Sequence, residues 1–227
     1  MEKGIFITGT GTDVGKTYVT ALLIKQLKET GVDAAYYKAA VSGNQRGTQG
    51  LVPGDAVYVK QISGISQSLD SMVPYIYEEA ISPHLAARRE GSPVDLSVVQ
   101  QGYDSLCQEY DFVVMEGSGG VLCPLRLDEK QEIWLEDIIK ALNLPCLVVA
   151  DSGLGTINAT LLTLEYLSSK HIITKGVILN HFHPDNEMEQ DNRRTIARKG
   201  KVPVVACVPE GATDIGKTCF LSSISSH

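Results

Sequence analysis

The sequence lacks the features that mark nucleic-acid-binding and membrane proteins. Lys and Arg form no basic block, and the formal net charge of the 227 residues is -7, so the composition argues against nucleic acid and anionic membranes as partners. No apolar run approaches membrane-spanning length, and the N-terminus shows no basic segment, apolar stretch and cleavage site in succession. We therefore expect a cytoplasmic protein without a membrane partner.

Cysteine is scarce and scattered. The five cysteines form no Cys-x-x-Cys pair, and at least three of them lie in apolar runs that are typical of a protein core. They are Cys107, Cys123, Cys146, Cys207 and Cys219. This pattern favours reduced thiols in a cytoplasm over a disulfide framework, a metal site or a redox site.

Short apolar runs are frequent, and each is followed by a loop and a helical pattern. Their apolar residues are consecutive rather than alternating, as in strands buried on both faces of a parallel sheet. The runs are GIFIT (4–8), AAYYK (34–38), FVVME (112–116), CLVVA (146–150), GVILN (176–180) and PVVAC (203–207). Apolar stripes predict helices over 18–29, 96–110, 134–142 and 157–168. With no linker, repeat or low-complexity segment, we predict one α/β domain over 1–227, a doubly wound and mostly parallel sheet.

Ligands of such sheets collect at the carboxyl ends of the strands, so the residues that follow each run are the candidates for function. These segments are 8–17, 38–42, 116–120, 151–158, 180–181 and 208–211.

Two segments end in Gly-Lys-Thr, as phosphate-binding loops do. The strict spacing occurs only in the second, Gly211 to Thr218, because the first, TGTGTDVGKT, has Thr10 where the leading glycine belongs. The first loop, however, follows a strand and precedes a predicted helix, whose N-terminal N–H groups and dipole favour phosphate beside Lys16 and Thr17. Only nine residues follow the second loop, too few for a stable isolated helix. We predict that the first loop of a P-loop NTPase-like fold binds nucleotide and that the second forms a turn in the tail, whose early part passes near the base.

Two acidic residues are candidates for Mg²⁺ near the Thr17 hydroxyl, because Mg²⁺ takes hard oxygen ligands. Glu116 ends a strand in FVVMEGSGG, and the glycines behind it allow close approach of a ligand, although a glutamate can also simply end a strand. Asp55 follows Pro53-Gly54, and spacing alone leaves it open whether it binds metal or caps a helix.

Lys38 follows the second predicted strand in YYKAAVSG. A lysine at a strand end usually faces solvent, but this one lies on the ligand-binding edge of the sheet, with Ser42 and Gly43 close behind it. On physical grounds it is a candidate to neutralise anionic oxygens.

The set of motifs resembles one family, the dethiobiotin synthetases. The resemblance rests on TGTGTDVGKT, YYKAAVSG, Asp55, PYIYEEAISPHLAARREG, MEGSGGVLCPL, GLGTINATLLTLEYL and GVILN, which occur in the family's order over residues 1 to about 180. It implies a ligase that converts 7,8-diaminononanoate, CO₂ or bicarbonate, and MgATP to dethiobiotin, ADP and phosphate. A substrate carbamate would attack the γ-phosphate, and the second amine would close the resulting carbamic–phosphoric anhydride into a cyclic urea.

The resemblance also implies residue roles. Lys16 would hold the β- and γ-phosphates, Lys38 would neutralise the carbamate and the transferring phosphoryl group, and Thr12 and Ser42 would hydrogen-bond their oxygens. Mg²⁺ would be held by Thr17, Asp55 and Glu116. Nucleotide would contact Asp13, Val14, Gly15, Lys16, Thr17, Tyr18, Asp55, Glu116, Gly117, Ser118, Gly119, Asn180, His181, Val208, Pro209 and Glu210, with the Asn180 amide on adenine. The diamine would contact Ser42, Gly119, Gly120, Val121, Leu154, Gly155, Thr156 and Asn158.

The segment DSGLGTIN offers a second helix start with free N–H groups, but no lysine, which suits a carboxylate. Its glycines could instead serve only a tight turn. The resemblance implies a homodimer in which this helix start, with Asn158, receives the substrate's carboxylate from the site of the other subunit.

Other interpretations stay open. Pro83-His84 belongs to a family block, yet the proline could simply start a helix, and His181, His183 and Asp185 lack metal-ligand spacing, which favours a solvated loop. A dimeric ATP switch of the partition or septum-positioning type shares the fold, but here the loop lacks that group's extra lysine and the tail has no amphipathic helix. A non-catalytic nucleotide-binding module is the third alternative.

Overall fold

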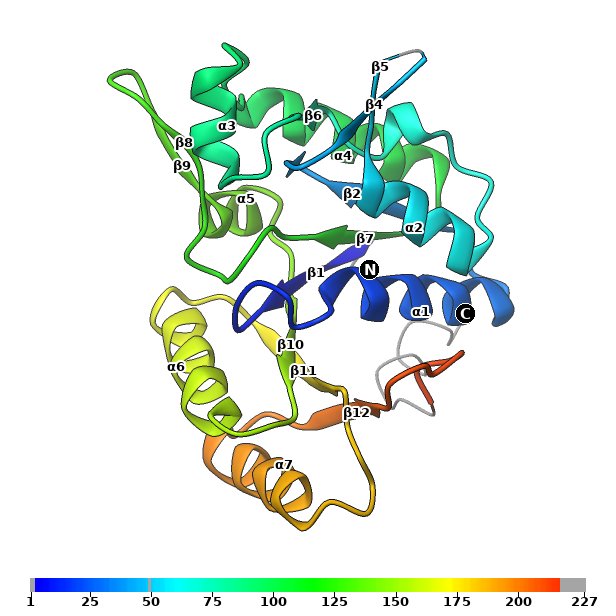
Figure 1. The fold of residues 1–227 in the computed structure, drawn as a ribbon, viewed down its shortest axis with the longest axis vertical. Helices are drawn as coiled ribbons and strands as arrows, with labels where there is room; N and C mark the ends of the chain where they lie inside the picture. Colours follow the sequence, from blue (N-terminus) through cyan, green and yellow to red (C-terminus); the bar gives the residue numbers. More distant parts are fainter. Residues whose placement is uncertain (1–2, 49, 217–227) are drawn as a thin grey trace.

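The computed structural model of the protein describes residues 3–48 and 50–216. Its centre is a six-stranded sheet in the order β12-β11-β10-β1-β7-β2, and every neighbouring pair is parallel (Figure 1). The strands are β1 Gly4–Gly9, β2 Ala34–Lys38, β7 Phe112–Glu116, β10 Cys146–Asp151, β11 Thr174–Asn180 and β12 Val204–Val208. The doubly wound α/β fold predicted from the sequence is confirmed.

Consecutive apolar residues allow each central strand to bury both of its faces. In β1, Phe6 packs into one hydrophobic layer, whereas Ile5 and Ile7 pack into the other. In β2, Tyr37 and Tyr36 divide between the layers in the same way. Side chains alternate along a strand, so an uninterrupted apolar run fills both layers.

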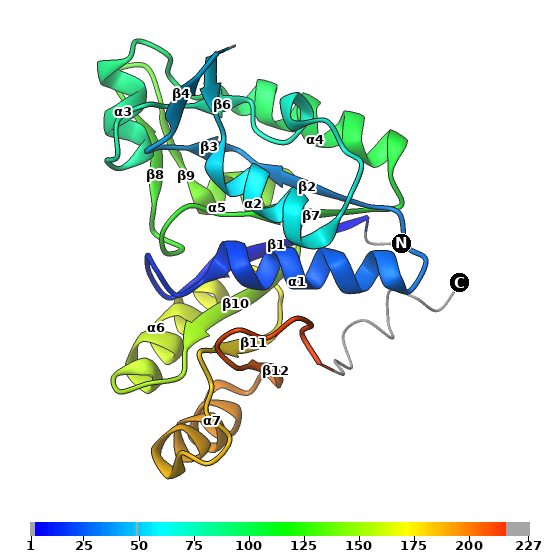
Figure 2. The ribbon, with the colours of Figure 1, turned by 45° about the vertical axis from the view of Figure 1, so that its right-hand side comes forward.

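Helices cover both faces of the sheet. The first layer contains buried residues of α3 Pro83–Arg89, α4 Leu96–Glu109, α5 Leu135–Ala141, α6 Thr156–Ser169 and α7 Glu187–Gly200. The second contains those of α1 Lys16–Glu29 and α2 Gly54–Ser63, which lie side by side (Figure 2). A short 3₁₀ turn, η1, spans Leu69–Ser71. Within the described part of the chain, no helix is both long and apolar enough to cross a bilayer.

Small strand pairs follow β2 and β7. They are β3 Ala40–Val41 with β6 Tyr75–Ile76, β4 Gln45–Gly47 with β5 Gly50–Val52, and β8 Pro124–Leu127 with β9 Glu132–Trp134. The sequence analysis predicted none of them. Strands of two to four residues show too little periodicity to be recognised.

The strand order reverses direction around β1, which lies between β7 and β10. The chain leaves β1 toward β2 on one side and later crosses to β10 on the other. Such a switch point opens a crevice at the carboxyl ends of the strands, where open α/β sheets bind their ligands. The segment that follows β1 is the first of the two Gly-Lys-Thr loops, so the fold places that loop in the crevice.

Candidate functional site

The loop between β1 and α1 has the geometry of an anion site. The N-cap residue of α1, Gly15, supplies no side-chain cap, which leaves the N–H groups of the first turn available. Thr10 N–H donates to Val149 O at 3.0 Å and ties the start of the loop to the neighbouring strand. Lys16 is only 7% exposed, and its ammonium donates to Gly11 O at 2.8 Å, so it closes back over the loop. Burial lowers the pKa of Lys16, an effect that the nearby Glu116 carboxylate opposes.

Gly15 is required for more than flexibility. It lies in the left-handed region, at a φ of 83°, and a Cβ atom there would come within 2.0 Å of Asn180 Nδ2. The loop and the end of β11 therefore pack so closely that only glycine fits between them.

A buried ionic network lies beside the loop. Glu116, at the end of β7, is 1% exposed and accepts three hydrogen bonds. Its Oε1 accepts from Thr17 Oγ1 and from Lys38 Nζ, both at 2.8 Å, and its Oε2 accepts from the Tyr36 hydroxyl at 3.0 Å. Lys38 Nζ also donates to Asp55 Oδ2 at 2.6 Å.

Lys38 is the cation of this network. It is 5% exposed, which differs from the solvated lysine usual at a strand end. Burial alone would lower the pKa of Lys38, but the carboxylates of Glu116 and Asp55 raise it above its ordinary value. Asp55 lies in the first turn of α2, where Pro53 is the N-cap residue without a side-chain cap, so the helix-cap alternative for Asp55 is wrong.

The oxygen atoms around Lys38 form a ligand set that fits Mg²⁺. One ammonium nitrogen lies within 2.8 Å of two carboxylates, and one of these carboxylates also accepts from the Thr17 hydroxyl. Two carboxylates and a hydroxyl are the hard ligands that Mg²⁺ takes together with waters and phosphate oxygens. No cluster of three His, Cys, Asp or Glu suited to a metal occurs within residues 3–48 and 50–216.

The glycine-rich loop after β7 packs against the phosphate loop. A Cβ on Gly119 would lie 3.7 Å from Thr12 Oγ1, and one on Gly120 would lie 3.6 Å from Gly9 O. Gly117 N–H donates to Ile7 O at 2.9 Å. The structure therefore brings the predicted segment 117–121 close to Thr12. Val121, the last residue of that segment, is buried.

Two predicted serines make internal contacts. The Ser42 hydroxyl donates to Ile81 O at 2.6 Å, and the Ser118 hydroxyl donates to Ala40 O at 2.9 Å. Ser118 thereby joins the loop after β7 to the segment after β2. With its proton given to Ile81 O, the Ser42 hydroxyl can only accept from any further partner.

The predicted base-contacting residues converge on the other side of the loop. Asn180, at the end of β11, is fully buried, and its Nδ2 donates to Val14 O at 3.1 Å. Val208 pairs with Asn180 across β11 and β12, whereas Pro209 and Glu210 are exposed. The Tyr18 hydroxyl donates to Ala212 O, so the start of the second Gly-Lys-Thr segment packs against α1 as a turn. Lys217 and Thr218 lie outside the described residues.

The predicted carboxylate site at the start of α6 is exposed in this chain. Leu154 is 93% exposed, Asn158 is exposed, and Gly155 has a φ of 91°. Thr156 is buried and its hydroxyl donates to Asp151 O. The structure therefore does not enclose this segment within one subunit.

Two contacts of the site were not predicted from the sequence. Tyr36 holds Glu116, and Asp151 accepts from the ring of His181 at 2.8 Å. A tyrosine inside an apolar strand signals nothing beyond a core position. Asp151 is the last residue of β10, at the ligand-binding edge, and its place directly after the predicted apolar run 146–150 was the available signal.

Pro83 and His84 also have a defined place. Pro83 is the first residue of α3, as the helix-start interpretation predicted. The Nδ1 atom of His84 is buried, without a hydrogen-bond partner among the described residues.

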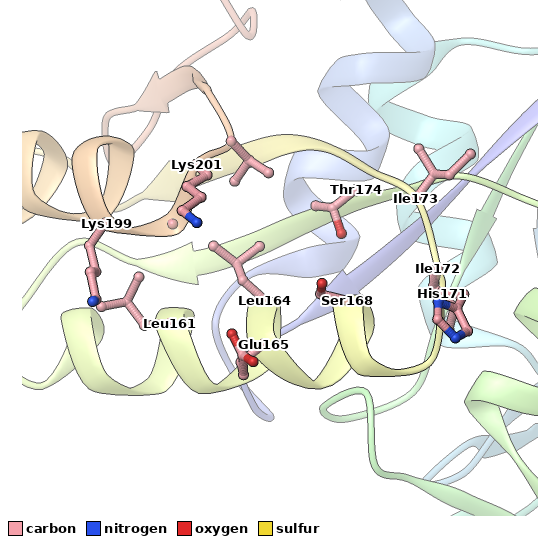
Figure 3. A pocket seen from close by; sticks show the side chains of 12 residues that line it. Leu161, Leu164, Glu165, Ser168, His171, Ile172, Ile173, Thr174, Lys199 and Lys201 are labelled. Carbon is pink, nitrogen blue, oxygen red and sulfur yellow. The ribbon is translucent and has the colours of Figure 1, made fainter.

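A separate cavity of about 660 Å³ lies at the opposite end of the sheet (Figure 3). It is formed by the C-terminal parts of α6 and α7 and by the start of β11, with Leu161 and Leu164 facing Lys199 and Lys201. It is thus remote from the carboxyl ends of the strands and contributes no residue to the network around Lys38.

Comparisons with known proteins agree with this geometry. Residues 3–218 match a family model described as an AAA domain. The ATP-dependent dethiobiotin synthetase BioD of Brachyspira hyodysenteriae is 48% identical over 93% of this chain and 94% of its own length. The proteins of the same name from Clostridium botulinum and Clostridium novyi are 44% and 42% identical over 91% and 92% of this chain, and over 91% and 88% of their own lengths.

Solved structures share the fold at low identity. The MinC:MinD cell division complex of Aquifex aeolicus matches with a TM-score of 0.58 and 17% identity, over 97% of this chain and 89% of that one. The cell division protein FtsY of Thermotoga maritima matches with a TM-score of 0.55 and 14% identity, over 100% and 68%. These similarities concern the fold alone.

Proposed function

The chain belongs to the dethiobiotin synthetase family, and from this premise we propose how its residues carry out the family's reaction. The enzyme is an ATP-dependent ligase of biotin biosynthesis that makes dethiobiotin. The assignment of roles to residues rests on one observation. The buried Lys38 ammonium is held between Asp55 and Glu116, directly beside the phosphate loop.

The proposed reaction has three steps. One amine of 7,8-diaminononanoate adds to CO₂ and forms a carbamate. A carbamate oxygen attacks the γ-phosphorus of ATP, and the bond to ADP breaks. The second amine then attacks the anhydride carbonyl, phosphate leaves, and the cyclic urea of dethiobiotin results. Such chemistry asks the protein for positioning and charge neutralisation.

The residues beside the phosphate loop divide these tasks. Lys16 holds the β- and γ-phosphates, a role supported by its buried ammonium, which donates to Gly11 O of the phosphate loop. Lys38 neutralises the carbamate and the transferring phosphoryl oxygens. Thr12 hydrogen-bonds those oxygens, and Ser42 does so once its hydroxyl proton turns from Ile81 O to the substrate. The backbone of Gly119, Gly120 and Val121 receives the diamine end.

Thr17, Asp55 and Glu116 would hold Mg²⁺ in this proposal, directly or through water. Bound there, the ion would supply positive charge to the phosphate oxygens. The rest of the nucleotide would lie along Asp13 to Tyr18, with the base at Asn180, His181 and the segment 208–210. Support comes from their convergence on one side of the loop.

The proposal includes a homodimer. The exposed start of α6, with Leu154, Gly155, Thr156 and Asn158, would receive the carboxylate of the substrate bound to the partner subunit. Exposure of Leu154 and Asn158 supports this arrangement. A cytoplasmic location, where ATP is available, is in accord with the free state of the described cysteines Cys107, Cys123, Cys146 and Cys207.

A phosphate-release assay tests the proposal. Purified protein with MgATP should release phosphate only when both 7,8-diaminononanoate and bicarbonate are present. When the bicarbonate is carbon-labelled, the label should appear in the urea carbon of the product. Release that needs a protein or lipid partner instead would support an ATP switch. Absence of release under every condition would support a non-catalytic module.

A further inference from the structure

Two roles assigned in the proposed function meet at one point of the structure. Lys38 is to reach the carbamate and the transferring phosphoryl group, whereas Asp55 and Glu116 are to hold Mg²⁺. Lys38 Nζ, however, lies 2.6 Å from Asp55 Oδ2 and 2.8 Å from Glu116 Oε1. The ammonium therefore lies between the two carboxylates, where an ion shared by them would bind.

Glu116 has no capacity to bind a metal ion in addition to its present partners at Oε1. That oxygen accepts from Thr17 Oγ1 and from Lys38 Nζ, and Oε2 accepts from the Tyr36 hydroxyl. A carboxylate oxygen has about two lone-pair sites, so Oε1 uses both. The Thr17 hydroxyl can donate its proton to Glu116 and still offer its oxygen to an ion, whereas the Lys38 ammonium has donors only and a like charge. Lys38 is therefore the partner that an ion at Oε1 displaces.

The charges of the site indicate when such an exchange is favourable. The Lys16 ammonium interacts electrostatically with Lys38, Asp55 and Glu116, and these two ammonium groups and two carboxylates balance each other. A divalent ion alone would bring an unbalanced positive charge into a largely buried site. The phosphates of a nucleotide supply the missing negative charge, and their oxygens are a new partner for the displaced ammonium. The exchange is therefore expected to need the nucleotide.

Lys38 can move its ammonium without moving its backbone. Its backbone N–H donates to Met72 O at 2.9 Å, and it pairs with Glu116 across β2 and β7, so the main chain is fixed at the strand end. The ammonium is carried by a flexible four-carbon stem. The side chain of Asp55 is 34% exposed, compared with 6% for Lys38, so solvent reaches the network at Asp55. An ion can approach from that side.

We propose that Lys38 and the divalent ion bind the same two carboxylates by exchange, so that binding of the metal–nucleotide complex releases the ammonium to the transferring phosphoryl group. This inference rests on the proposed function, which supplies the metal ligands and the target of Lys38. Without nucleotide, Lys38 competes with the ion for Asp55 and Glu116. With nucleotide, the ammonium and the ion bind the same phosphates, and competition ends.

The test measures Mn²⁺ affinity by electron paramagnetic resonance, with Mn²⁺ as the probe for Mg²⁺. Without nucleotide, Lys38→Met is expected to bind Mn²⁺ at least about tenfold more tightly than the wild type, because both carboxylates are then released from the ammonium. With a non-hydrolysable ATP analogue, this advantage is expected to disappear, because the ammonium of the wild type has moved to the phosphates. Equal Mn²⁺ affinity of the two proteins without nucleotide would show that the ammonium and the ion bind side by side, and would overturn the proposal.

Lys16→Met is the matched control. Lys16 is buried like Lys38 and interacts with the same carboxylates, but its ammonium donates to Gly11 O at 2.8 Å and to neither carboxylate. Loss of its charge alone is expected to change nucleotide-free Mn²⁺ affinity by less than about threefold. An equal gain in Lys16→Met and Lys38→Met would show a general effect of charge instead of competition for shared oxygens, and would also overturn the proposal.

Thermal melting gives a second readout. Mg²⁺ is expected to raise the melting temperature of Lys38→Met more than that of the wild type, because the ion replaces the lost counter-charge. If Lys38→Met folds poorly, Lys38→Gln is expected to show the same direction in both measurements. Equal Mg²⁺ shifts in wild type and variant would contradict the exchange. Since neither measurement needs turnover, a protein that shows the exchange but makes no dethiobiotin would contradict the proposed function alone.

Discussion

At the scale of single residues, the buried carboxylate of Glu116 has three donors with three different tasks. Thr17 Oγ1 links it to the phosphate loop, Tyr36 orients its second oxygen from the neighbouring strand, and Lys38 balances its charge. Removal of one partner from a buried ion pair leaves an uncompensated charge, which costs more than the pair itself contributes. Substitutions at these positions therefore affect both catalysis and stability.

Lys38→Met is expected to lower turnover at least a hundredfold, because a charge aimed at developing anionic oxygens is worth about 3 kcal/mol of barrier. It should also lower the free energy of unfolding by roughly 3 kcal/mol, because Glu116 and Asp55 then face each other without their cation. Steady-state phosphate release and urea unfolding measure the two effects. Lys130→Met, at an exposed lysine between β8 and β9, is the control that should change neither. Normal turnover in Lys38→Met would reduce Lys38 to a structural counter-ion.

Tyr36→Phe is expected to weaken divalent-metal binding about tenfold while turnover at saturating metal stays near wild type. Burial, together with the neighbouring Glu116 carboxylate, raises the pKa of Tyr36 well above its ordinary value, so the phenol keeps its proton and donates at every working pH. Without that donor, Glu116 Oε2 is buried and unpaired. Mn²⁺ binding in the presence of a non-hydrolysable ATP analogue, followed by electron paramagnetic resonance, measures the change. Unaltered Mn²⁺ affinity would show that Tyr36 serves packing only.

The site residues that could be predicted are those whose position follows from the local sequence pattern alone. Lys16 and Thr17 follow a strand and start a helix, and Glu116 ends a strand before three glycines, so local pattern was sufficient. Tyr36 was not predictable, because Glu116, its partner, is 80 residues away. Asp151 lay in a candidate segment, but its pairing with His181, 30 residues away, could not be predicted. Only the register of neighbouring strands, Lys38 opposite Glu116 and Asp151 opposite Asn180, brings them into place.

At the scale of elements, strands buried on both faces were predictable because short runs of consecutive apolar residues are typical of such strands. All six predicted runs lie in the central sheet, and their bounds differ from the structure by no more than two residues. Helix α7 was not predicted, because its sequence buries few apolar side chains and instead packs with Ile196, Glu189 and Asn192. Its polar and apolar residues do separate onto two faces, but its low overall hydrophobicity left no apolar stripe that stood out in the sequence.

Gly15→Ala tests the junction between the phosphate loop and α1. A methyl group there would meet Asn180 Nδ2 at 2.0 Å on a backbone that already has a φ of 83°. We expect loss of nucleotide binding and a decrease of about 2 kcal/mol in the free energy of unfolding. Gly54→Ala, at the start of α2, is the matched control, since a Cβ there has no neighbour within 4 Å among the described residues and its φ is not positive. Equal behaviour of the two variants in nucleotide titration and thermal melting would contradict the close packing described here.

At the scale of the whole molecule, the network around Lys38 lies within one chain, whereas the start of α6 is exposed. Leu154, just before α6, is 93% exposed and Leu162, in the middle of α6, is 63% exposed, so this region presents apolar side chains that the described residues do not cover. A second copy that brings its own α6 to the diamine would cover them and complete the substrate site. This arrangement makes each site depend on residues of two chains.

Mixed dimers test the shared site. Lys16→Ala removes the phosphate contact, and Gly155→Asp places a side chain and a negative charge at a position with a φ of 91°. Each homodimer should therefore be inactive. In a mixed dimer one site combines both defects, while the other combines an intact phosphate loop with an intact start of α6. Random mixing of equal amounts should restore about a quarter of wild-type activity, because half of the dimers are mixed and each has one intact site. Separately tagged chains, purified in tandem, provide dimers of known composition for the assay. If such verified mixed dimers stay inactive while each chain still binds its partner, both halves of the site belong to one chain and the shared-site proposal is wrong.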